Sequence, residues 1–127
     1  MKVSLPFTVL AEDMAAFAQV SGDYNPIHTD ADFARSRGFQ GPLVYGGLLL
    51  AQVSRVIGMR LPGRNAVWTR VEMDFRKPLM VGEGAHVEAE IINISQAVRQ
   101  IELKLRISVA QRLLAKGMAE VLVLGND

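Results

Sequence analysis

Apolar and polar residues alternate strictly along two stretches in the second half of the chain, which predicts two strands that each bury one face. In the first stretch, residues 67–75, the alternate positions on one face are Val67, Thr69, Val71, Met73 and Phe75. In the second stretch, residues 101–109, the apolar positions are Ile101, Leu103, Leu105, Ile107 and Val109, and the residues between them are mostly charged or polar.

Two further strands are expected, over about residues 85–95 and 113–124. The alternation in the first of them slips at Ile91 and Ile92, where a β-bulge is possible. A hairpin-like connection at 110–112 precedes the last strand. Because no helical pattern interrupts the four strands, we expect them to pair antiparallel in one sheet.

The first half of the chain has helical periodicity instead. A helix is predicted over residues 11–20, and Gly22 can end it in a left-handed conformation. Asp30 is a suitable cap for a short second helix over residues 31–37. A third helix should begin near Pro42 or Gly46 and extend to residues 61–63.

The third predicted helix is apolar on nearly every side, which is typical of a helix enclosed by other structure. It is too short to cross a membrane, so we interpret it as a core helix. A sheet with one apolar face and one such helix predicts an α+β fold in which the antiparallel sheet wraps around a long central helix.

Composition narrows the range of functions. The 127 residues predict a single domain over 1–127. The absence of cysteine and of a signal-like N-terminal segment favours a cytoplasmic protein. The net charge of +1 shows no basic excess, which argues against nucleic acid as a partner. Half of the residues are hydrophobic, so a partner subunit could cover some of them.

The candidate chemistry begins in residues 21–28, which read SGDYNPIH. Pro26 fixes one backbone angle and favours an extended Asn25, so the loop between Asp23 and His28 should be stiff. A stiff loop can direct an acid and a base at one point. The alternative is an ordinary turn that contains a surface or structural histidine.

A second glycine-rich loop, GFQGPLVYGG, leads directly into the predicted core helix. The N–H groups at the start of that helix, at Gly46 and Gly47, have no intrahelical partner and carry no side chain. Such groups suit a carbonyl oxygen that becomes negative in a transition state. Alternatively, the two glycines only allow close packing.

Residues 17–28 resemble the hydratase signature of the MaoC-like (R)-specific enoyl-CoA hydratases, and the likeness continues over about residues 10–90. Proteins of this family have the hot-dog fold, in which an antiparallel sheet wraps a long central helix, and they usually form homodimers. The resemblance implies the same fold and assembly here, or a higher oligomer built from dimers.

The resemblance also implies a reaction and its residues. Asp23 and His28 would be the catalytic pair, the Gly46 backbone N–H would bind the oxyanion, and Asn25 and Ser54 would support them. Ser54 can equally bond its own helix backbone. The pair would add water to a trans-2-enoyl thioester, giving an (R)-3-hydroxyacyl thioester, or catalyse the reverse. The substrate would be carried by CoA or acyl-carrier protein, and no metal or other cofactor is expected.

Most relatives have His-Gly-Met where this chain has Tyr45-Gly46-Gly47, a change expected to alter the pocket wall. Arg76 and Lys77 could pair with CoA phosphates or be a solvated charge pair.

Two other functions remain open. A hot-dog thioesterase would be expected to carry its acid on the central helix, yet residues 47–57 contain no Asp or Glu. A non-catalytic acyl-CoA-binding module would be expected to lack the acid or the base, and both are present.

Overall fold

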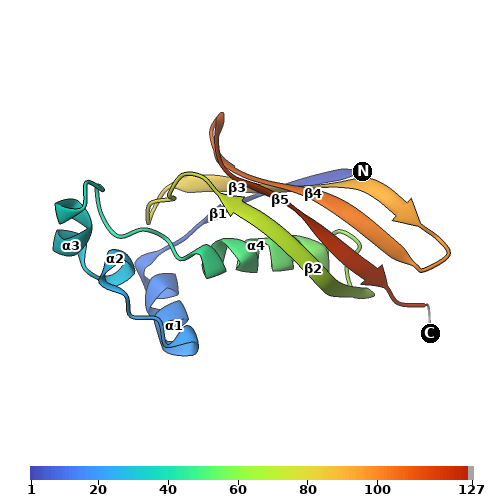
Figure 1. Ribbon diagram of the computed structural model, residues 1–127, viewed down its shortest axis with the longest axis horizontal. Coiled ribbons are helices and arrows are strands. Elements are labelled where there is room, and N and C mark those ends of the chain that lie inside the picture. Colours follow the sequence, from blue (N-terminus) through green and yellow to red (C-terminus); the bar gives the residue numbers. More distant parts are fainter. Residues whose placement is uncertain (126–127) are drawn as a thin grey trace.

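The computed structural model describes residues 1–125, which form a five-stranded antiparallel sheet in the order β1-β3-β4-β5-β2 (Figure 1). The predicted domain, 1–127, includes Asn126 and Asp127, which lie outside the described residues. The strands are β1 (Lys2–Thr8), β2 (Ala66–Phe75), β3 (Gly84–Ser95), β4 (Gln100–Val109) and β5 (Arg112–Val123).

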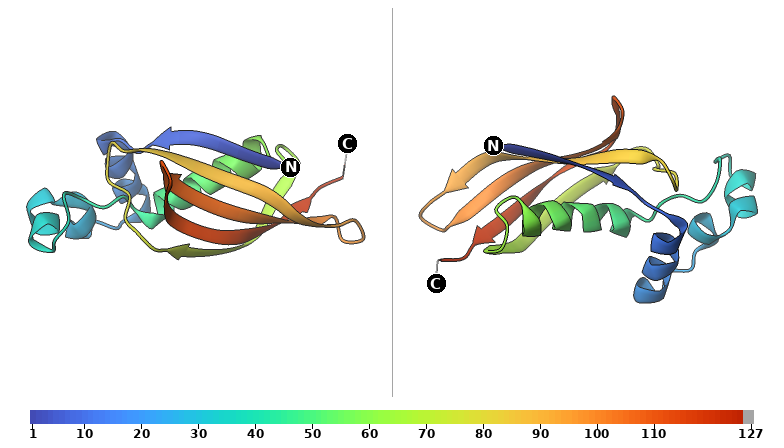
Figure 2. Two further views of the ribbon diagram at one scale, coloured as in Figure 1. Left: turned by 90° about the horizontal axis from the view of Figure 1, so that it is seen from above. Right: turned by 180° about the vertical axis from the view of Figure 1, so that it is seen from behind.

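Helix α4 lies against one face of this sheet, and the three shorter helices gather beyond one end of α4 (Figures 1 and 2). This arrangement confirms the predicted α+β class with a sheet packed on a central helix. Within residues 1–125, none of the helices is long and apolar enough to cross a membrane. The helices are α1 (Ala11–Ser21), α2 (Pro26–Thr29), α3 (Ala31–Ser36) and α4 (Gly46–Met59).

The four predicted strands are all present as β2 to β5, and β1, which was not predicted, adds a fifth at the edge of the sheet. Leu5 and Phe7 of β1 are buried in the core, but Pro6 between them obscures the strand pattern. Proline is tolerated here because β1 pairs with β3 alone and therefore has one free side. The bulge predicted at Ile91 and Ile92 is confirmed by a register shift between Ile91 and Asn93.

Helix α4 is less enclosed than its composition suggested. One face is buried against the sheet through Leu49, Val53, Val56 and Ile57. The other face, with Ala51, Ser54, Arg55, Gly58 and Met59, is exposed. The sheet wraps α4 on one side, as expected, and within residues 1–125 no strand covers the opposite side of the helix.

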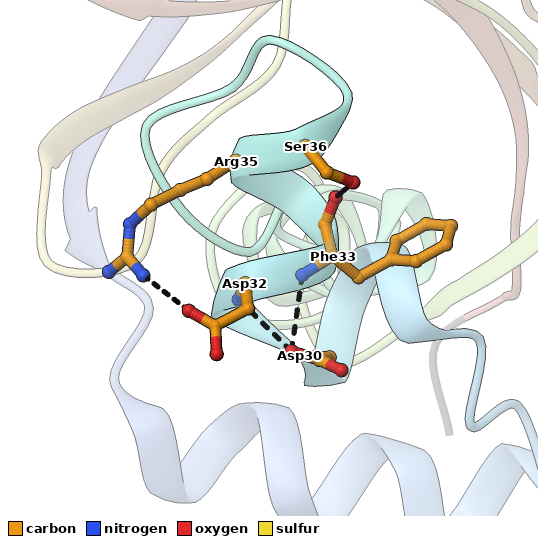
Figure 3. Close-up of polar contacts among 5 residues, drawn as sticks. All are labelled: Asp30, Asp32, Phe33, Arg35 and Ser36. Carbon is orange, nitrogen blue, oxygen red and sulfur yellow. Dashed lines mark hydrogen bonds and ion pairs between the residues drawn. The ribbon is translucent and has the colours of Figure 1, made fainter.

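Local hydrogen bonds set the limits of the short helices that carry the candidate loop. Gly22 ends α1 with φ of 77°, as predicted, and its N–H donates to the Ala18 carbonyl at 2.9 Å. Asp30 caps α3, as predicted, by accepting from the N–H groups of Asp32 and Phe33 at 3.0 and 3.2 Å (Figure 3). The candidate loop is thus held between two defined helix ends.

Candidate active site

His28 lies in the single turn of α2 and is fixed by the segment that precedes α4. Its Nδ1 is 2.7 Å from the carbonyl oxygen of Leu43. The Leu43 N–H in turn donates to the Ile27 carbonyl at 3.0 Å. Since a carbonyl can only accept, neutral His28 carries its proton on Nδ1 and leaves a lone pair on Nε2. The imidazole is therefore held in the form that can act as a base.

The loop before α2 is built from successive side chain–backbone hydrogen bonds. The Ser21 hydroxyl accepts from the Asp23 N–H at 3.0 Å, and Asp23 Oδ1 accepts from the Asn25 N–H at 3.0 Å. Asn25 Oδ1 then accepts from the Ile27 N–H at 2.9 Å and caps α2. These bonds constrain the backbone of the loop, in keeping with the stiffness expected from Pro26. The Asp23 and Asn25 side chains are exposed to solvent.

The side chain of Tyr45 contacts both ends of the loop that carries Asp23 and His28. Its hydroxyl donates to the Asp23 backbone carbonyl at 2.7 Å. Its ring stacks on His28, with centroids 4.1 Å apart and planes 25° apart, and also contacts Phe17 at 4.7 Å. Only 2% of the Tyr45 surface is exposed. Tyr45 therefore contacts both the backbone of Asp23 and the ring of His28.

The environment of Tyr45 keeps its hydroxyl protonated. Burial raises the pKa of Tyr45 above its ordinary value, and the charge of Asp23 and the neighbouring Tyr24 raise it further. A neutral phenol is a hydrogen-bond donor. The contact with the Asp23 carbonyl is therefore maintained at physiological pH.

Gly46 is the first residue of α4, which agrees with one of the two starts predicted for this helix. Together with His28, it lines a cavity of about 360 Å³. Among the hydrogen bonds of residues 1–125, none uses the Gly46 N–H. The ring of Phe75 lies beside Gly46, and Arg76 and Lys77 follow it along the cavity. The remaining lining residues are mostly apolar: Phe39, Leu43, Val44, Leu49, Pro78 and Leu79.

His28 also lines a second cavity of about 390 Å³, whose walls include Ala11, Met14, Ala15 and Ala18 of α1. His28 therefore borders both cavities and is half-buried between them. A base, an unpaired backbone N–H and apolar walls in one place suit a small acyl group whose carbonyl oxygen gains negative charge.

Ser54 does not join this group. It lies on the exposed face of α4, and no hydrogen bond within the described part of the chain links it to Asp23. Its supporting role stays a prediction.

The roles of two contributors were not identified from the sequence. The carbonyl of Leu43 orients His28, and Tyr45 lies beneath the loop instead of in the pocket wall. No sequence signal marks a backbone carbonyl as a histidine partner. Tyr45 was noted only as a departure from the family pattern, and its bond to the backbone of Asp23 required the structure.

The MaoC-like domain family matches residues 1–112. The chain belongs to this family. A 3-hydroxybutyryl-CoA dehydratase of Methylorubrum extorquens is 31% identical over 115 residues, which are 91% of this chain and 73% of that protein. An (R)-specific enoyl-CoA hydratase of Aeromonas caviae is 37% identical over 81 residues, which are 64% of this chain. That match spans only 60% of the Aeromonas protein.

The MaoC-like chain also resembles solved structures over nearly its whole length. The (R)-hydratase of A. caviae superposes with a TM-score of 0.93 at 31% identity, covering 98% of this chain and 95% of that one. This likeness confirms the hot-dog fold that the resemblance implied.

Proposed function

We propose that this protein is an (R)-specific enoyl-CoA hydratase and 3-hydroxyacyl thioester dehydratase. The observation that carries the proposal is a cavity lined by both His28, whose Nε2 is free, and Gly46, whose N–H is unpaired among the described residues. The relatives named above as hydratase and dehydratase support it. Asp23 lies in the same loop as His28. Two successive side chain–backbone hydrogen bonds, from the Asn25 N–H to Asp23 and from the Ile27 N–H to Asn25, connect the two residues.

In the proposed reaction, Asp23 and His28 hold one water molecule between them. His28 Nε2 removes a proton from the water as its oxygen bonds to Cβ of the trans-2-enoyl thioester. The electron pair of the double bond moves toward the thioester carbonyl, and the Gly46 N–H stabilises the oxyanion. The proton held by His28 is then delivered to Cα on the same face, which regenerates the neutral imidazole and gives the (R)-3-hydroxyacyl thioester. Dehydration runs through the same steps in reverse.

The cavity supports an acyl thioester as the substrate. Its apolar walls suit the acyl chain, and Arg76 and Lys77 provide positive charge beside it. CoA carries phosphates that such charges can contact, and acyl-carrier protein carries a phosphopantetheine. The chemistry needs only an acid, a base and a hydrogen-bond donor, so the proposal includes no metal or redox cofactor.

We also propose that the working form is a homodimer in the cytoplasm. The exposed face of α4 and the exposed apolar side chains Val67, Val71 and Phe75 on the edge strand β2 support a protein partner. An exposed sheet edge next to apolar surface is commonly covered by another subunit. A second copy of this chain would cover the open side of α4.

The proposal is tested with crotonyl-CoA and longer trans-2-enoyl-CoA substrates, by following the loss of the enoyl absorbance. Asp23→Asn and His28→Ala should each abolish turnover while the circular dichroism spectrum is retained. His86→Ala is the matched control, because His86 is the other histidine of the chain and is exposed on β3. We expect this variant to remain active.

Full activity in Asp23→Asn or in His28→Ala would refute the assignment. Thiol release is measured in the same reactions, since a thioesterase would free CoA without forming a hydroxyacyl product. Binding of enoyl-CoA without any turnover would instead identify a binding module.

A further inference from the structure

The side chain of Tyr45 contacts both ends of the Asp23–His28 loop. The hydroxyl bonds the backbone of Asp23, and the ring stacks on His28. Its main chain directly precedes Gly46, so the same residue also sets where α4 begins. Three elements of the proposed site therefore meet at one position.

The hydroxyl bond differs in kind from the other hydrogen bonds of residues 21–25, the part of the loop that contains Asp23. Within the described residues, the other hydrogen bonds of segment 21–25 all have their partners in residues 17–29. Local turns give the loop its shape but cannot fix its place relative to the rest of the protein. The Leu43 bonds fix the His28 end of the loop, and the Tyr45 hydroxyl fixes the Asp23 end.

A purely space-filling role would not need the hydroxyl. Tyr45 is among the largest fully buried side chains, and a phenylalanine ring would fill nearly the same volume. A buried hydroxyl instead requires a partner, and here that partner is the carbonyl of the residue proposed as the acid.

We propose that Tyr45 is a positioning residue, which holds the backbone of Asp23 at a fixed distance from the ring of His28. The inference rests on the proposed hydratase function. Reacting groups must be placed within a fraction of an ångström, and a shift of about 1 Å can cost on the order of a hundredfold in rate. Loss of the hydroxyl should therefore lower turnover while leaving the cavity that binds substrate intact.

The test uses Tyr45→Phe, which retains the ring and its stacking and removes only the hydroxyl. We expect kcat for crotonyl-CoA to fall by about tenfold to a hundredfold. KM should stay within about twofold, since the cavity walls are unchanged. Ile107→Val serves as the control, because it weakens a fully buried position in β4, outside the residues that form the site. That variant should melt at a lower temperature and retain its kcat.

A second measurement does not depend on turnover. Amide hydrogen exchange over residues 22–29 should be faster in Tyr45→Phe than in the wild type, and exchange in β4 should be unchanged. If the wild type turns over no enoyl thioester, the proposed function fails and the exchange measurement alone decides whether Tyr45 holds the loop. Unchanged exchange, or a kcat within twofold of the wild type, would overturn the inference.

Discussion

The imidazole Nδ1 of His28 lies 2.7 Å from the carbonyl oxygen of Leu43, and this single contact determines which ring nitrogen can act as a base. The carbonyl accepts the Nδ1 proton, so Nε2 is the unprotonated nitrogen of the neutral ring. Leu43 is itself bonded to Ile27, the residue before His28, so the orientation does not depend on substrate.

This contact predicts the tautomer of His28 in the free protein. Long-range nitrogen–proton NMR spectra recorded above pH 8 should show His28 with its proton on Nδ1. His86 provides an internal comparison, because it is the only other histidine and is exposed on β3. An exposed imidazole has no fixed partner, and its spectrum should show a mixture of tautomers. A predominantly Nε2-protonated His28 would contradict the proposed role as base.

The side chain of Asn25 should matter for both stability and turnover. Asn25→Ala removes the cap of α2, and losing such a cap costs about 1 kcal/mol in the free energy of unfolding. Because α2 carries His28, we expect turnover to fall as well. Urea unfolding and the enoyl absorbance assay measure the two effects.

Asp30→Ala is the matched control for Asn25→Ala. It removes the cap of the next helix, α3, which carries none of the proposed site residues (Figure 3). Its stability loss should be similar, at about 1 kcal/mol, with most of the turnover retained. Equal losses of turnover in both variants would mean that Asn25 acts only through general stability.

Local signals in the sequence were sufficient to place much of the loop. The end of α1 at Gly22, the cap at Asp30 and the start of α4 at Gly46 each depend on residues within one turn, and all three are confirmed. Asp23 and His28 could be proposed together because the Asn25-Pro26 step between them is also local.

Contacts between distant residues could not be predicted in the same way. Strand β1 was missed because its place depends on pairing with β3, which lies some 80 residues later in the chain. The contacts of Tyr45 with Asp23 and of His28 with Leu43 depend on how two loops dock. The pattern of apolar and polar residues carries no information about how these loops pack together. The contacts that hold Asp23 and His28 in place therefore could be found only in the structure.

A side chain at Gly47 is expected to displace the ring of Phe17. A β-carbon at this position would overlap the ring of Phe17, which packs against Tyr45. Overpacking of this kind costs about 1–3 kcal/mol, whereas replacing glycine by alanine in a helix gains at most about 1 kcal/mol. Gly47→Ala should therefore have a lower free energy of unfolding than the wild type, as measured by urea denaturation.

Gly46→Ala makes the complementary comparison on the same helix. A β-carbon there would meet Phe75 at 3.4 Å, which is close to an ordinary contact. Its stability should remain near that of the wild type. If Gly46→Ala is the more destabilised of the two, the packing of Phe17 against α4 is not as described.

The raised pKa of Tyr45 predicts how the stability contributed by its hydroxyl depends on pH. Burial and the Asp23 charge favour the neutral phenol in the folded protein. The contribution is therefore fully present below the unfolded pKa of about 10 and is lost as the pH rises through the higher folded value. The difference in unfolding free energy between the wild type and Tyr45→Phe should be constant from pH 7 to 9 and then decrease. A difference that stays flat to pH 11 would show that the folded and unfolded pKa values are equal.

Arg76 and Lys77 should affect CoA thioesters more than thioesters without phosphates. Both side chains line the cavity that contains His28 and are exposed. Exposed charge contacts contribute about 0.2–1 kcal/mol each, so replacing both by glutamine should raise KM for enoyl-CoA by a few-fold. The KM for the corresponding N-acetylcysteamine thioester, which lacks phosphate, should not change. Added salt should weaken wild-type binding of enoyl-CoA because it screens these contacts, and it should have less effect on the glutamine variant. Equal KM increases for both substrates would instead assign Arg76 and Lys77 to the shape of the cavity wall.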